Sequence, residues 1–123
     1  ADLAEKYTAD ADYEPGTVVT FGGSAEVTQS TVDGDRRVAG VVSTNPSYLM
    51  NAGLESEHVA EVALQGRVAC HVIGPVTKGD MMVSAGNGYA RPWNNPSIGM
   101  VIGKSLENFD GVSGVIEIAV GRF

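Results

Sequence analysis

The sequence predicts an all-β domain, built as a compact small barrel or sandwich of about nine short strands with an internal repeat and an N-terminal arm. Three observations lead to this prediction. The chain has 16 glycines, too many for a helical protein, and they recur at the ends of apolar runs, where hairpins need positive φ. No segment shows a long helical period of apolar residues. Short apolar runs also echo one another in the two halves of the chain.

The echo joins two pairs of segments. Residues 15–21 (PGTVVTF) lead on to 37–43 (RVAGVVS), and residues 78–84 (KGDMMVS) lead on to 96–103 (PSIGMVIG). Each pair reads as a glycine turn, a short apolar strand, a polar hairpin and a strand of small residues. We align Gly16 and Gly40 with Gly79 and Gly99, although the second spacing is slightly shorter than the first. The repeat predicts a duplicated β unit, preceded by an arm that is not repeated.

The expected strands are short apolar runs bounded by turn residues. They cover residues 17–21, 26–30, 38–43, 59–64, 67–73, 80–84, 88–91, 98–107 and 115–122. Turns are expected at 22–24, 33–34, 65–66, 85–87 and 111–114, and an Asn-Pro pair opens a loop over 45–54. Alternation predicts two buried faces, formed by Val68, Cys70 and Val72 and by Ile116, Ile118 and Val120.

Residues 1–13 are rich in alanine and acidic residues, and they are too few for a stable isolated helix. We expect an extended arm or a single turn, docked through Leu3, Tyr7 and Tyr13. The predicted domain organisation is therefore an N-terminal arm over 1–13 and a single β domain over 14–123.

Charge and composition limit the partners. The net charge is −7 and the pI is near 4.6, and no basic stripe is present, so we expect no binding to nucleic acid. No apolar run is long enough to span a membrane, so we expect no membrane insertion. One cysteine cannot form an intrachain disulfide, and we expect Cys70 to be a small core residue.

Metal and cofactor sites are not expected. The only histidines, His58 and His71, lie in different predicted elements without a Cys or His at ligand spacing. We expect His71 to be a packed or interfacial side chain. The acidic residues near the arm are expected to form a solvated face, since the spacing of a calcium loop is missing.

Two groups of residues are candidates for function. Asp2 and Glu5 are carboxylates three residues apart, and such a pair can polarise a peptide and move a proton. The alternative is a solvated N-terminal turn, in which this spacing is common. Trp93 and Tyr89 could form a ligand-binding, sugar-stacking surface, although isolated aromatic residues in loops more often pack against neighbours.

The whole chain resembles the C-terminal domain of virion structural and tail-fibre-like proteins of tailed phages, especially cyanophages and related marine phages. The matching stretches are 2–7 (DLAEKY), 14–19 (EPGTVV), 37–44 (RVAGVVST), 66–68 (GRV), 74–80 (GPVTKGD), 102–107 (IGKSLE) and 116–123 (IEIAVGRF). The resemblance implies a virion protein, made in the host cytoplasm, that contacts itself and other virion proteins.

More distantly, the D-x-A-E start and the G-V-V-S core resemble the autoprocessing domain of phage neck-appendage proteins. In that family a C-terminal intramolecular chaperone assists trimerisation of a fibre and then cuts itself off. Carried over by residue, this implies scission between Ala1 and Asp2, with Glu5 as the acting carboxylate and Asp2 assisting. No enzyme with multiple turnovers is expected.

The sequence thus leads to three functional hypotheses. The first is a fibre or appendage domain that promotes assembly of a homo-oligomer, expected to be a trimer. The second is a single-turnover autoproteolytic chaperone domain of the glutamic peptidase type. The third is a module that binds a glycan of the host surface through Trp93 and Tyr89.

Overall fold

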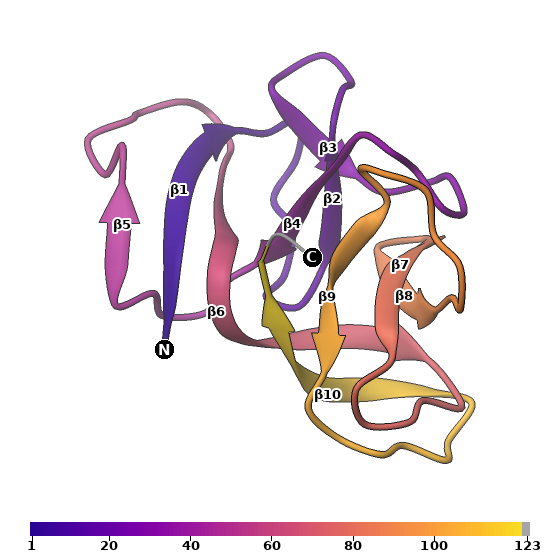
Figure 1. Cartoon of the computed structure of the whole chain (residues 1–123). Coiled ribbons are helices and arrows are strands. Elements are labelled where there is room, and N and C mark those ends of the chain that lie inside the picture. Colours follow the sequence, from indigo (N-terminus) through magenta and orange to yellow (C-terminus); the bar gives the residue numbers. More distant parts are fainter. Residues whose placement is uncertain (122–123) are drawn as a thin grey trace.

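The computed structural model describes residues 1–121 and contains ten strands and no helix among them, which confirms the all-β prediction (Figure 1). The strands are β1 (Asp2–Thr8), β2 (Val18–Phe21), β3 (Val27–Gln29), β4 (Val38–Val42), β5 (Tyr48–Met50), β6 (Val59–Ile73), β7 (Met81–Gly86), β8 (Tyr89–Pro92), β9 (Val101–Ser105) and β10 (Ser113–Val120). The ends of the predicted domain and of its last strand, residues 122–123, lie outside the described residues.

The strands close into two five-stranded rings that share β6. In barrel 1, β1 pairs with the first half of β6, followed in order by β4, β2 and β3, and a parallel bridge from Ala9 to Val27 closes the ring. In barrel 2, the second half of β6 pairs with β10, followed by β9, β7 and β8, and a parallel pair of Val72 with Ala90 closes the ring. Figure 1 shows β6 running beside β1 and then turning to run beside β10.

The second barrel repeats the first over a unit of three strands, β2 to β4 in barrel 1 and β7 to β9 in barrel 2. Corresponding residues are separated by a constant offset along the chain. Val19 pairs with Gly40 in barrel 1, and Met82 pairs with Gly103 in barrel 2. Both ladders shift register at the next residue, and both units start at a glycine with positive φ, Gly16 at 92° and Gly79 at 91°. The alignment of Gly40 with Gly99 is therefore wrong. The structural counterpart is Gly103, and its separation from Gly79 equals the separation of Gly40 from Gly16.

The segment expected as an unrepeated arm is extended, and its first part is repeated too. The bridge between Ala9 and Val27 recurs at the same offset as the pair of Val72 and Ala90, so β1 corresponds to the second half of β6. The first half of β6 corresponds to β10 at a shorter offset, because the segment before it is longer than the one before β10. That extra length contains β5, which pairs in parallel with β1 at the edge of the sheet (Figure 1).

Two local predictions are corrected by these pairings. The strands expected over 59–64 and 67–73 are one strand of 15 residues, and Gly66 (φ 110°) lies within it instead of in a tight turn. A Cβ at Gly66 would lie 2.5 Å from the carbonyl oxygen of Ala1, so glycine allows β1 to approach β6 closely. The loop expected over 45–54 contains the short strand β5.

Apolar residues fill both barrels. A smaller cluster of buried side chains lies in barrel 1 and consists of Ala9, Val19, Val27, Val42, Ala60 and Val62. A larger cluster fills barrel 2 and extends to Val18, Val41 and Ala63 of barrel 1, so the barrels are joined by continuous apolar packing. The two predicted faces, which include Cys70 and Ile118, are buried as expected. Burial raises the pKa of the Cys70 thiol to about 12, which suits an inert core residue.

Candidate functional site

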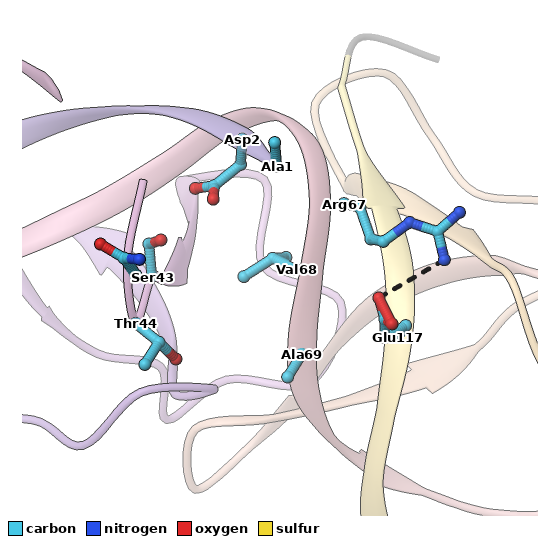
Figure 2. Close-up of a pocket in the computed structure, with 9 residues that line it drawn as sticks. Ala1, Asp2, Ser43, Thr44, Arg67, Val68, Ala69 and Glu117 are labelled. Atoms are coloured by element: carbon cyan, nitrogen blue, oxygen red, sulfur yellow. Dashed lines mark hydrogen bonds and ion pairs between the residues drawn. The ribbon is translucent and has the colours of Figure 1, made fainter. Parts of the chain in front are cut away.

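A pocket of about 330 Å³ lies at the start of β1, against the middle of β6 (Figure 2). Its walls come from residues 1–2, the segment 43–45 after β4, residues 67–69 of β6, and Glu117 of β10. The pocket therefore lies where the two barrels meet at the bend of β6. Among the residues predicted to carry function, it contains Asp2.

The carboxylate of Asp2 is held in an unusual environment. Asp2 is only 7% exposed because β1 pairs with Gly66 on one side, and its backbone carbonyl accepts a hydrogen bond from the amide of Ser47 at 2.9 Å. Its Oδ2 and the Oγ of Ser43 are both buried without a hydrogen-bond partner among the described residues. A buried polar atom that stays without a partner costs about 1–3 kcal/mol, so these two atoms are the groups of this pocket with which a water or a bound ligand would pair.

The rim of the pocket carries an ion pair. A guanidinium nitrogen of Arg67 lies 3.5 Å from a carboxylate oxygen of Glu117, and the two side chains are drawn joined in Figure 2. Both side chains are largely exposed, so this pair adds little to stability. It does place one positive and one negative group at the entrance, beyond the carboxylate of Asp2.

The structure does not bring Glu5 to Asp2. Residues three apart on a strand point to opposite faces, and the extra residue of the local bulge is Leu64 of β6, so alternation along β1 is regular. Asp2 and Ala4 are buried, whereas Glu5 shares the other face with Tyr7. Burial raises the pKa of the Tyr7 hydroxyl, and the nearby Glu5 carboxylate raises it further. The dyad would have formed on a helical turn, but β1 is a strand.

Trp93 and Tyr89 do not form one stacking surface. Arg91, which separates the two aromatic residues in the sequence, has its guanidinium 4.5 Å from the ring centre of Trp93. Arg91 is also fixed by two hydrogen bonds to Asp33, at 2.6 and 2.8 Å, and these hold the pKa of the Asp33 carboxyl below its usual value. Tyr89 instead packs edge-on against His71, with ring centres 5.5 Å apart.

Sequence reasoning missed Ser43 and a second polar pocket around His71 and Tyr89. Ser43 is distant from Asp2 along the chain, and only the pairing of β4 and β1 with β6 brings them together. Within residues 1–121, no three His, Cys, Asp or Glu side chains are grouped to hold a metal ion. The same part of the chain has no helix long and apolar enough to cross a membrane.

Comparison of this architecture with solved structures gives two matches along nearly the whole chain. A C-terminal fragment of gene product 12 of bacteriophage phi29 matches with a TM-score of 0.69 and 15% identity, over 97% of this chain and 99% of that one. The fold is one found in bacteriophage proteins. The N base of head fiber gp8.5 of bacteriophage phi29 matches with a TM-score of 0.56 and 10% identity, over 98% of this chain and 94% of that one.

Sequence comparison adds no family. No protein-family model matches the chain, and no curated protein matches it. At identities of 15% and 10%, the structural likeness establishes the shared fold. The link to cyanophages and marine phages stays a prediction of the sequence.

Proposed function

We propose that this chain is a structural domain of a phage virion, located in a fibre or appendage. The observation that carries the proposal is the length of the structural match. A C-terminal fragment of one bacteriophage protein and the N base of a bacteriophage head fiber each align with more than nine-tenths of this chain and of the matched fragment. A fold shared with a fibre base along nearly its whole length supports a structural role.

We further propose that the domain assembles with copies of itself, as a trimer. Val112 and Val115 are 85% and 58% exposed. They lie next to exposed Ile73, because the amide of Gly74 donates to the carbonyl of Val112 and Ile73 pairs with Ser113. We call the group of Ile73, Val112 and Val115 the valine patch. An exposed apolar patch on a small domain is typical of an interaction surface.

Mass measurement in solution tests the assembly. The wild-type chain should be trimeric by sedimentation equilibrium, and the double substitution V112D/V115D should leave it monomeric, because six carboxylates would be brought together in the trimer. V32D is the matched control, since Val32 is also a partly exposed valine but lies on another loop. A wild-type chain that stays monomeric at high concentration would exclude the oligomer.

A second candidate is autoproteolysis before Asp2, supported by the carboxylate of Asp2 and its buried, unpartnered oxygen. In this reaction water attacks the carbonyl carbon that precedes Asp2. The C–N bond then breaks, and the amine of Asp2 takes up a proton. A chain that carries the native residues upstream of Asp2 tests it by mass spectrometry. Cleavage should stop in D2N, and E5Q tests the role of Glu5. An uncut, folded chain would exclude the activity, and an active E5Q variant would exclude Glu5 alone.

A further inference from the structure

A second pocket, of about 360 Å³, lies between the two barrels, and its residues are used neither by the proposed assembly nor by autoproteolysis. Its principal lining residues are Asp12, Tyr13, Gln29, His71, Asn87 and Tyr89. We propose that this pocket, which we call the junction pocket, binds a neutral saccharide. Its volume falls in the range of small-molecule sites, and such sites occur preferentially where two structural units meet.

Three neutral polar groups of the junction pocket are unengaged. The side-chain amides of Gln29 and Asn87 and the hydroxyl of Tyr89 make no hydrogen bond within residues 1–121. An amide offers a carbonyl acceptor and two donors, and a phenol offers one of each. Adjacent hydroxyls of a sugar ring present the same mixture of donors and acceptors. The pocket therefore matches a polyol in hydrogen-bonding type.

Aromatic surface accompanies these groups, and it is held in place. The Tyr89 ring packs edge-on against His71, and His71 lies so close to Gly16 that a Cβ there would be 2.5 Å from the imidazole. The Tyr13 hydroxyl donates to the Asp10 carboxylate, which fixes the second ring. Fixed aromatic rings offer an apolar face to the C–H groups of a sugar while the polar groups bind its hydroxyls.

Charge selects a neutral ligand over an anionic one. Asp12 and Glu14 line the junction pocket, and carboxylates accept hydrogen bonds from sugar hydroxyls but repel another anion. The imidazole of His71 lies 3.6 Å from the Glu14 carboxylate, and that of His58 lies 2.9 Å from Asp12. Sugar acids and phosphorylated sugars are thus disfavoured at this site.

The backbone around the pocket is already organised. Asn87 (φ 53°) and Gly88 (φ 75°) form the turn between β7 and β8. The Gly88 amide donates to the Ser30 carbonyl at 3.0 Å, and its carbonyl accepts from the Val18 amide at 2.8 Å. These two bonds tie the turn of barrel 2 to β2 and to the residue that follows β3 in barrel 1. A ligand would therefore bind without first ordering a loop, which lowers the cost of binding.

Titration of the folded chain by amide NMR tests the proposal. The probes are glucose, galactose, N-acetylglucosamine and their β-linked disaccharides, with glucuronic acid as the anionic comparison. At least one neutral sugar should shift the amides of Gln29, His71, Asn87 and Tyr89 in a saturable manner, and glucuronic acid should bind more weakly. Shifts centred on Trp93, or no saturable shift with any of the neutral sugars, would overturn the proposal.

Substitutions separate the site from the fold. N87G removes the amide but keeps a residue that tolerates positive φ, and Y89F removes only the hydroxyl; each should lower the affinity at least several-fold. N51G is the matched control, because Asn51 also has positive φ (57°) and lies outside the pocket. N51G and W93A should bind as the wild type does. Unchanged binding in both N87G and Y89F would refute the site, whatever the oligomeric state of the domain.

Discussion

Gly103 has no room for a side chain against the neighbouring strand of barrel 2, and replacing it should cost more stability than replacing Gly53 or Gly79. A Cβ at this position would lie 2.1 Å from the carbonyl oxygen of Ala119, on the neighbouring strand β10. The atom in the way is backbone, and the ladder of β9 and β10 pairs Lys104 with Ala119 at this point. The clash can be relieved only by separating the two strands.

The expected loss of stability can be worked out by comparing three glycines whose φ angles and free space differ. Overpacking costs about 1–3 kcal/mol, and G103A should reach about 3 kcal/mol because no flexible side chain can yield. Gly79 has a φ of 91° and open space around its Cβ position, so G79A should cost only the backbone strain of about 1–2 kcal/mol. Gly53 has neither constraint, so G53A should stay within about 0.5 kcal/mol of the wild type.

Urea unfolding followed by circular dichroism measures the free energy of unfolding of each variant at a similar m-value. G53A should be the most stable variant, G79A should be intermediate and G103A should be the least stable. A G103A variant that does not fold would also agree with this order. G40A gives an independent reading, because its Cβ would lie 2.4 Å from the carbonyl oxygen of Ala63. A G103A variant as stable as G53A would show that the strands are not held at this distance.

Three further predictions concern titratable groups. D35N should lower the free energy of unfolding by about 2 kcal/mol in urea titrations, because the carboxylate of Asp35 is buried and accepts charged hydrogen bonds from Arg37. These bonds lower the pKa of Asp35 below 3.8, so their contribution is complete above that pH and is lost as the pH falls through the folded pKa; D35N should lose this dependence. Cys70 should not react with Ellman's reagent in the folded chain and should react fully in denaturant, and fast native reaction would contradict its burial. The Asp12 carboxylate raises the pKa of His58 above 6.5, so the pKa of His58 measured by NMR titration should fall in D12N. An unchanged pKa would show that the two side chains do not form this ion pair in solution.

Local features of this fold could be predicted from the sequence. The hairpin between β2 and β3 forms at Gly22 and Gly23, because both adopt the positive φ that few other residues tolerate. The buried face of β10 follows from the large apolar residues at the alternate positions 116, 118 and 120. Both features depend only on residues that are close in the chain, so they can be predicted from the sequence alone.

Pairings between distant residues could not be predicted in the same way. Gly66 reads locally as a turn residue, but it pairs with Asp2 on one side and with Val120 on the other, and these two partners keep β6 continuous. The repeat is visible in the sequence, but the apolar run after Gly99 resembles the one after Gly40, and this resemblance leads to the wrong alignment. The equal spacing of Gly16 to Gly40 and of Gly79 to Gly103 is the better guide.

The candidate site shows the same limit. The chemistry of its carboxylate points to Asp2 in the sequence. A partnership with Glu5 requires that residues three apart share a face, which holds on a helix and fails on β1. Ser43 lies beside Asp2 only because β4 and β1 pair with the same strand. Tyr89 was identified, yet its neighbours Gln29 and His71 come from two other strands.

Because both barrels share β6, we expect the chain to fold in one direction during synthesis. All the strand pairings that close the ring of barrel 1 lie within residues 1–66, so we expect this ring to close first, although part of its core is covered only by barrel 2. The remaining half of β6 then leaves barrel 1 already extended, with one edge ready for β10 and the other for β8. We therefore expect the first barrel to act as a template for the second, with the N-terminal half of the chain folding before the C-terminal half.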